Sequence, residues 1–306
     1  MNLEHPNKYP LTFEEGLKIL KQSFSKENYL KASKESQIKI TLLLMKNSYP
    51  LMKYYNAFKL NNMELLNNSL YETGQLMQIS NITSPGTDHG YYGMNITPNL
   101  LAANMMERIK LLLPEENGLS TGKSAGAQIA NLLMAIIYDN LEFKEKALVL
   151  SEKELVKKIP EYVKCWIECM RAILLKDCIR FNEQLDLFCK KYIHCKEYGI
   201  NNFNKGFCIE AHGLYNLAMW AYNGELRNNI AIPQVSNFSK SLAEFQRKNN
   251  FSVGKIVNRY PKEMDICNKL LFCNPPKMFL KAYGKEKIID VERYTKEIIK
   301  IILEDE

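Results

Sequence analysis

Residues 120–140, Ser-Thr-Gly-Lys-Ser-Ala-Gly-Ala-Gln-Ile-Ala-Asn-Leu-Leu-Met-Ala-Ile-Ile-Tyr-Asp-Asn, decide the class of fold. Small residues open the stretch, and the longest apolar run of the chain, Leu132–Tyr138, follows them. A run of this length is too short to span a bilayer and is typical of a helix buried in a protein core. Most of the chain around it shows helical spacing and no convincing alternation. We therefore expect an all-α fold, a multi-helix bundle with helical-hairpin, repeat-like packing.

Start and stop signals extend this prediction along the chain. Thr12-Phe-Glu-Glu15 and Ser151-Glu-Lys-Glu154 have the pattern of a capping box, which predicts a helix start at each. Thr97 and Pro98 predict the cap and first residue of a helix that ends before Pro114. Other helices are expected near residues 29–46, 50–60, 63–79, 120–140, 161–175, 178–193, 205–222, 237–249, 263–272, 276–283 and 288–303. A sheet is not expected.

The domain organisation is set by length and by one long segment between helices. A chain of 306 residues is long enough for two domains or one large one. Residues 80–99 contain Gly and Tyr and connect two helical regions, which fits either a functional loop or a joint between domains. We assign residues 1–95 to an N-terminal helical layer, which need not be separate, and residues 96–306 to the main α-helical domain.

The net charge of +7 comes from 41 Lys and Arg against 34 Asp and Glu. Only seven of the basic residues are Arg, and the Lys are scattered along helical stretches, which favours a solvated surface over a nucleic-acid interface. Residues 61–140 differ from the rest, with three basic and seven acidic side chains. This acidic middle predicts a partner with a basic contact face.

The cellular compartment is predicted from the N-terminus and the cysteines. Residues 1–11 are polar, and no apolar stretch is long enough to span a membrane. Six of the eight cysteines lie between Cys165 and Cys208, mostly within helical patterns, where thiols behave as small hydrophobes. We expect a cytoplasmic protein that contacts neither a membrane nor nucleic acid.

Two motifs that suggest cofactor chemistry do not fit their requirements. Gly118-Leu-Ser-Thr-Gly122-Lys123-Ser124 has three residues between its glycines, whereas a phosphate-binding loop has four and follows a strand. A helix start capped by the Gly-Ser segment explains it better. The His and Cys residues lack the spacing of a zinc site. We expect no metal and no cofactor.

Two polar clusters remain as candidates for function. Asp88-His89 with Tyr91 and Tyr92 fits a structural loop, a binding surface or, least well, a general acid and base pair. His212 lies one helical turn from Asn216, and for it a buried structural role is favoured over catalysis.

The second half of the chain, about residues 120–250, resembles immunity protein family 49, whose members guard bacteria against polymorphic toxins. The residues that carry the resemblance are Tyr162-Val-Lys-Cys-Trp166, Ala172, Leu175, Asp177, Phe181, His212-Gly213-Leu-Tyr-Asn-Leu-Ala218, Ile232-Pro233, Phe238, Leu242-Ala243 and Gln246. The resemblance implies a bacterial immunity protein that occludes a cognate secreted toxin without catalysis. It implies structural roles for Trp166, Phe181, His212, Gly213, Ala218, Pro233, Phe238 and Gln246.

The acidic middle supplies the candidate toxin-binding residues, namely Asp88, His89, Tyr91, Tyr92, Glu115 and Glu116. We expect all of these except His89 to be exposed. Two other functions remain open. One is an α-helical adaptor with a concave groove for another protein, and the other is a helical enzyme that uses His89 or His212 as a base. The toxin and the oligomeric state are left open.

Overall fold

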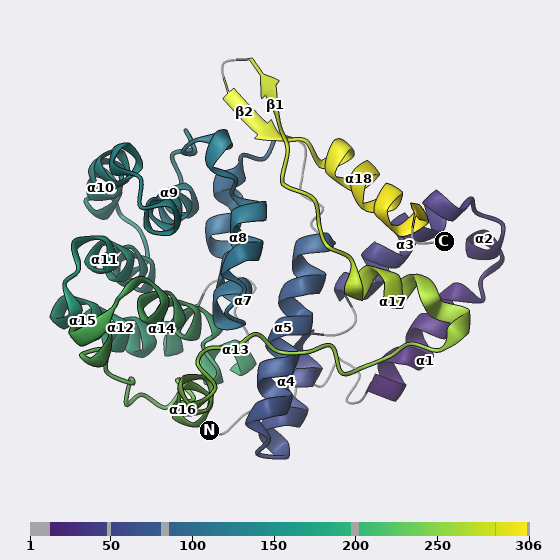
Figure 1. The fold of residues 1–306 in the computed structure, drawn as a ribbon, viewed down its shortest axis with the longest axis horizontal. Coiled ribbons are helices and arrows are strands. Elements are labelled where there is room, and N and C mark those ends of the chain that lie inside the picture. The colour runs from purple at the N-terminus through teal and green to yellow at the C-terminus, as the bar shows by residue number, and fades with distance from the viewer. Residues whose placement is uncertain (1–12, 48–49, 81–85, 197–201, 285, 305–306) are drawn as a thin grey trace.

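Helices form nearly all of the regular structure in the computed structural model of this chain, which describes residues 13–47, 50–80, 86–196, 202–284 and 286–304. Figure 1 shows these helices packed as a bundle with one small hairpin projecting from its edge. The all-α prediction is confirmed.

Four consecutive helices lie side by side at one flank of the bundle (Figure 1). They are α9 (Ala125–Tyr138), α10 (Leu141–Leu155), α11 (Glu161–Leu175) and α12 (Cys178–Ile193). After α9 and α11 the chain turns at Asp139 and Lys176, whose φ angles of 47° and 58° are left-handed and end a helix. The side chains of Asn140 and Asp177 then accept a backbone N–H of the following helix. Short turns of this kind produce the helical hairpins that we predict.

Helix α9 is the buried centre of this flank, as the stretch 120–140 predicts. Its residues are buried without a break from Ala127 to Ile137. It packs against α10 and α11 on one side and against the short helix α6 (Tyr92–Asn95) on the other. The Ser124 side chain accepts the N–H of Ala127 and so caps α9, which confirms the predicted helix start in this segment.

The middle of the molecule joins this flank to the rest of the chain. Here α5 (Met63–Ile79) packs against α7 (Thr97–Ala102), and α7 packs against α14 (Ile209–Ala221). Gly213 makes the second contact possible, because a Cβ there would lie 3.0 Å from both the Leu101 Cβ and the Pro98 carbonyl oxygen. The helix predicted from Thr97 to Pro114 is instead two helices, since α7 stops before Asn104 (φ 59°) and α8 (Met106–Leu112) follows.

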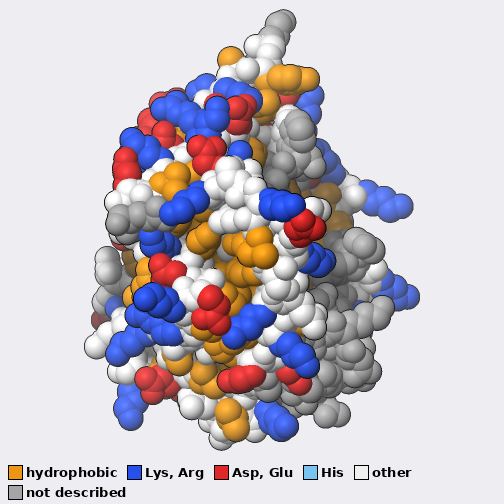
Figure 2. Space-filling view, turned by 90° about the vertical axis from the view of Figure 1, so that its right-hand side faces the viewer, with side chains coloured by type: hydrophobic (Ala, Val, Ile, Leu, Met, Phe, Trp, Pro, Cys, Tyr) orange, Lys and Arg blue, Asp and Glu red, His pale blue; other side chains and the backbone are white. Residues whose placement is uncertain are grey.

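The first and last helices of the chain pack together on the opposite side, at the right of Figure 1. Helices α17 (Asp265–Phe272) and α18 (Val291–Glu304) both contact α3 (Lys34–Asn47). The side chains of Lys21 and Glu263 form an ion pair at 3.1 Å, which links α1 (Phe13–Phe24) to the turn η3 (Lys262–Met264). Buried contacts thus cross the predicted boundary at residue 95. On this side, Figure 2 shows positive and negative side chains interspersed around exposed hydrophobic groups, with no continuous basic stripe on the part that is described.

The remaining helices are short; in Figure 1, α2 lies at the right edge and the others lie in the lower half. They are α2 (Glu27–Leu30), α4 (Pro50–Lys59), α13 (Asn202–Gly206), α15 (Gly224–Asn228) and α16 (Lys240–Lys248). An extended segment then crosses α5 on its way from α16 to α17. The buried Glu72 carboxylate of α5 holds it by accepting the N–H groups of Val257 (2.6 Å) and Asn258 (3.1 Å).

Three further sequence predictions about secondary structure are wrong. The predicted helix 276–283 is instead the start of an antiparallel hairpin, β1 (Leu280–Tyr283) and β2 (Glu286–Ile289), which turns at Gly284 with φ 62°. Ser151 does not start a helix, because α10 already begins at Leu141 and Ser151 is buried within it. Thr97 does not cap α7 with its side chain, since its hydroxyl donates to the Gly93 carbonyl (2.9 Å). The capping box predicted at Thr12 begins outside the described residues.

Within the described part of the chain, none of the helices is both long and apolar enough to cross a membrane.

Candidate functional site

Three segments that are distant in sequence meet at the base of the hairpin, at the top of Figure 1. The N–H of Ile289 donates to the Thr87 carbonyl at 2.8 Å, and the Asn117 side chain donates to the Met278 carbonyl at 3.2 Å. An ion pair of 2.8 Å joins Lys277 to Glu116. We call the exposed surface formed by residues 86–92, 115–122 and 277–296 the hairpin face. All six predicted toxin-binding residues lie within these three segments, and two of them, His89 and Tyr92, are buried.

His89 and Asp88 hold two of these segments together. His89 is only 2% exposed, and its Nε2 lies 3.1 Å from the Gly118 carbonyl oxygen, to which a neutral imidazole donates. One carboxylate oxygen of Asp88 accepts the N–H of Gly90 (2.6 Å) and the hydroxyl of Ser120. Burial lowers the pKa of His89, although the Asp88 charge opposes that shift. The pair therefore connects residues 88–90 to Gly118 and Ser120 through hydrogen bonds. This geometry adds no support to the general-base alternative.

The loop that follows Gly118 is fixed onto α9 rather than shaped around a phosphate. The Ser120 backbone exchanges two hydrogen bonds with the Asn131 side chain, of 2.7 and 3.1 Å. The Gln128 side chain donates to the Gly122 carbonyl at 3.0 Å. These contacts use the polar groups of the loop for packing, in agreement with the prediction that this motif is a helix start.

The turn η1 (His89–Tyr91) and α6 approach α9 very closely because glycines face the helix. A Cβ on Gly93 would lie 2.3 Å from the Gly126 carbonyl oxygen, and one on Gly90 would lie 2.7 Å from the Ala127 Cα. This packing explains the glycines of residues 90–93 and the small residues that open α9. Within the segment 80–99, which we predict to be a functional loop or a domain joint, residues 89–95 thus form short helical turns packed against α9.

The six predicted binding residues differ in how far their side chains are exposed to solvent. Tyr92 is fully buried with its hydroxyl 3.3 Å from the Met278 sulfur, so the expectation that it is exposed is wrong. It faces inward because residues 89–95 form helical turns against α9. Tyr91 is 39% exposed, Glu115 and Glu116 are exposed, and Asp88 is partly exposed. Of the six residues, Tyr91, Glu115 and Glu116 are therefore available for contacts with a partner.

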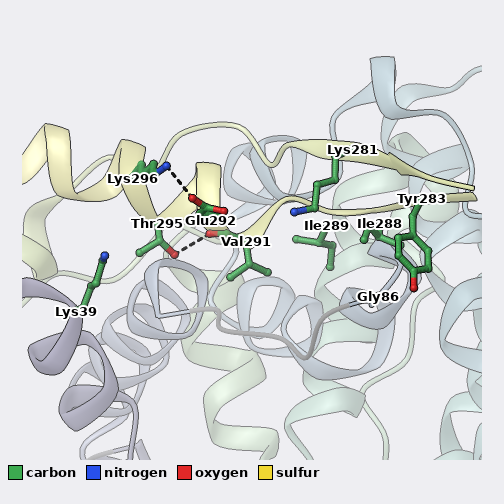
Figure 3. Close-up of a pocket in the computed structure, with 10 residues that line it drawn as sticks. All are labelled: Lys39, Gly86, Lys281, Tyr283, Ile288, Ile289, Val291, Glu292, Thr295 and Lys296. Carbon is green, nitrogen blue, oxygen red and sulfur yellow. Dashed lines mark hydrogen bonds and ion pairs between the residues drawn. The ribbon is translucent and has the colours of Figure 1, made fainter. Parts of the chain in front are cut away.

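A groove of about 640 Å³ opens between the hairpin, α18 and α3 (Figure 3). Its lining residues are Lys39, Gly86, Lys281, Tyr283, Ile288, Ile289, Val291, Glu292, Thr295 and Lys296. The hairpin register pairs Lys281 with Ile288, so these side chains and Tyr283 share one face of the strands. Tyr283 is 65% exposed. Sequence reasoning missed the groove because it assigned part of the hairpin to a helix.

Lysines from three elements surround the apolar floor of the groove, as Figure 3 shows. Lys296 pairs with Glu292 at 2.8 Å, and Lys281 pairs with Asp290 at 3.6 Å. Lys39 of α3 has no ion pair with any described residue. The groove thus combines apolar area with lysine side chains at its margin.

His212, the other candidate base, is a packed core residue. Its ring stacks on Phe238 at a centroid distance of 4.0 Å, and its Nε2 accepts the N–H of Ser239 at 3.0 Å. Complete burial lowers the pKa of His212 to about 3, so the ring is neutral at physiological pH. All eight positions to which the resemblance assigns structural roles are buried: Trp166, Phe181, His212, Gly213, Ala218, Pro233, Phe238 and Gln246.

Gln246 and Asn216 connect the helices beneath this core. The Gln246 amide donates to the Asn67 side chain and to the Ala102 carbonyl, each at 2.9 Å. The Asn216 amide donates to the Gln246 oxygen at 3.2 Å and to the Leu101 and Ala102 carbonyls. The network ties α5, α7, α14 and α16 together.

Cysteines and acidic residues form no metal centre in the part of the chain that is described, where no group of three or more ligand side chains is placed to hold an ion. All eight cysteines are buried, and burial raises the pKa of Cys165 to about 11.

Comparison of the chain with known protein families, with curated proteins and with solved structures found no match. The resemblance to immunity protein family 49 therefore stays a prediction.

Proposed function

We propose that this chain is a non-catalytic protein that neutralises a cognate toxin by binding it through the hairpin face. The observation that carries the proposal is that the segments of the hairpin face carry an apolar groove, two exposed tyrosines (Tyr91 and Tyr283) and two exposed carboxylates (Glu115 and Glu116). Tyrosines that combine apolar area with a hydroxyl are typical of protein-binding surfaces. Both candidate catalytic histidines, by contrast, are buried and used in packing.

The chemistry of the face defines the partner that it fits. An apolar segment of the toxin would fill the groove and cover Tyr283 and Val291. Basic side chains of the toxin would lie opposite Glu115 and Glu116, in keeping with the basic contact face predicted from the sequence. Glu116 already pairs with Lys277, whereas Glu115 accepts a hydrogen bond from the neutral Asn140 side chain (3.1 Å), so Glu115 has more to gain from a cationic partner. Charge complementarity at the rim would speed association and select the partner.

Growth protection tests the proposal directly. The chain is co-expressed with the product of the neighbouring gene, as the candidate toxin, and survival and co-purification are measured. The variants Tyr283→Ala and Glu115→Lys change exposed side chains, so they should leave the melting temperature unchanged. Together they should weaken binding at least tenfold, about 1.4 kcal/mol, and reduce protection.

Matched controls come from the other flank of the bundle. Ile179 is 75% exposed on α12, and Glu145 is exposed on α10. The variants Ile179→Ala and Glu145→Lys should keep full protection. Equal protection by both pairs of variants would exclude the hairpin face as the binding site. Binding without protection would favour the adaptor function instead.

A further inference from the structure

A second cleft lies at the C-terminal end of α14 and shares no lining residue with the groove of the hairpin face. It has an inner compartment of about 190 Å³ and an outer one of about 290 Å³. Both compartments are lined by Met219, Arg227, Asn250 and Phe251, so they form one continuous site. We call it the arginine cleft.

Two cations without a counter-charge face the outer compartment. Arg227 and Arg247 both line it, and neither forms an ion pair with a described residue. No Asp or Glu lines either compartment. The Arg247 guanidinium donates to the Tyr215 hydroxyl (2.8 Å) and to the Ile230 carbonyl (3.2 Å), which fixes its position. Burial raises the pKa of Tyr215, and the charges of Arg247 and Arg227 oppose that shift, so both cations act on one hydroxyl.

Arg227 also lies over the Phe251 ring, with its guanidinium carbon 5.4 Å from the ring centroid. Arg171 and Arg180, by contrast, both pair with Glu168. A pair of guanidinium groups presents a fork of N–H donors that matches the oxygens of a phosphate. The outer compartment therefore has the chemistry of a phosphate site.

The inner compartment offers one hydrogen-bond acceptor and one donor. Asn216 is 1% exposed, and its amide nitrogen is already directed to three acceptors, while its Oδ1 has no partner among the described residues. Nδ2 of Asn104 is likewise buried without a described partner. Both residues line this compartment. Buried polar groups are almost always satisfied, so an unpaired donor and acceptor in one cavity indicate a polar ligand.

The walls of the inner compartment are suited to a flat ring. Trp220, Phe251 and the thioethers of Met106 and Met219 line it. The backbone holds this shape at a cost in strain, because Phe251 has a left-handed φ of 54°, which a bulky side chain rarely adopts. Aromatic side chains of this kind stack on nucleobases.

We propose that the arginine cleft binds a nucleoside monophosphate, with the base in the inner compartment and the phosphate on Arg227 and Arg247. The edge of the base forms hydrogen bonds with the Asn216 oxygen and the Asn104 amide, and the face of the base stacks against Trp220. This site is independent of toxin binding, because it lies on other elements of the fold.

Calorimetric titration of the purified chain tests the assignment with AMP, GMP, CMP and UMP as probes. At least one monophosphate should bind at least tenfold more tightly than its nucleoside and than inorganic phosphate. Bound ligand should also quench the fluorescence of Trp220, a signal that the Trp220→Phe variant loses. Absence of binding by all four monophosphates at millimolar concentration would overturn the proposal, as would equal binding of phosphate alone.

Substitutions locate the site. Arg227→Ala and Arg247→Ala should each reduce affinity at least tenfold, whereas Arg259→Ala, a control at an exposed arginine outside the cleft, should leave it unchanged. Asn104→Gly removes the free amide and tolerates the left-handed backbone at that position, so it should fold and bind more weakly. Unchanged affinity in both arginine variants, with unchanged melting temperature, would contradict the assignment.

Discussion

His212 shows at the residue scale how a titratable side chain becomes part of a hydrophobic core. Stacking on Phe238 and the hydrogen bond from Ser239 define its orientation, and burial removes its charge. The helical pattern around residue 212 is sufficient to favour a structural role for this residue. Local spacing does not predict the burial of Tyr92. The side of η1 and α6 that faces the core is set by contact with α9, which lies some thirty residues later in the chain.

The burial of His212 predicts how stability depends on pH. The pKa falls from 6.5 in the unfolded chain to about 3 in the folded one, so below pH 6.5 the unfolded state binds the additional proton. The free energy of unfolding is therefore highest above pH 6.5 and decreases as the pH falls toward 3, by up to about 1.4 kcal/mol per pH unit. Urea unfolding followed by tryptophan fluorescence at pH 7, 6 and 5 measures this slope.

The variant His212→Gln provides the control for this slope. Its side-chain oxygen can still accept the Ser239 N–H, but it does not titrate. The variant should lose part of the decrease between pH 7 and pH 5, with His89, whose pKa is also lowered by burial, supplying some of the remainder. An identical slope in both proteins would show that His212 is not buried as described.

At the scale of elements, periodicity predicts the helices whose boundaries are set by local signals. The structure confirms the helices predicted at residues 161–175 and 178–193. Lys176, with its left-handed backbone, ends α11, and the Asp177 side chain caps α12. The sequence pattern predicts element boundaries wrongly where tertiary contacts determine them. Ser151 has the pattern of a cap but lies inside α10, where its hydroxyl donates to the Leu148 carbonyl and accepts from Arg171. The hairpin at residues 280–289 is too short for alternation to identify it.

The contact between α6 and α9 supplies a test at this scale. Gly93→Ala would place a Cβ 2.3 Å from the Gly126 carbonyl oxygen, and this backbone cannot move without displacing α9. We expect a loss of about 2 kcal/mol or more in the free energy of unfolding, measured by urea denaturation. Gly126→Ala is the matched control, since its nearest neighbour would be 3.3 Å away and alanine favours a helix. Its loss should be smaller than that of Gly93→Ala, because the Gly90 carbonyl oxygen need move only slightly, and equal losses in both variants would refute the close approach at Gly93.

At the scale of the whole molecule, the fold and not the position in the sequence determines where charged side chains lie. The acidic side chains of residues 61–140 do not gather into one patch: Glu72 is buried against the crossing segment, Asp88 binds Gly90 and Ser120, and Glu116 pairs with Lys277. The N- and C-terminal helices pack on each other. The hairpin face depends on this closure, because it combines residues 86–92, 115–122 and 277–296, and its groove is completed by Lys39 of α3. No single stretch of sequence could indicate it.

Hydrogen–deuterium exchange of the chain, alone and in complex with the product of the neighbouring gene as the proposed toxin, tests the central claim most directly. The account predicts slower exchange in the bound chain at residues 86–92, 115–122 and 277–296, with little change on the outer side of α10 and α12. Slower exchange confined to α10 and α12, with none at the hairpin face, would contradict it.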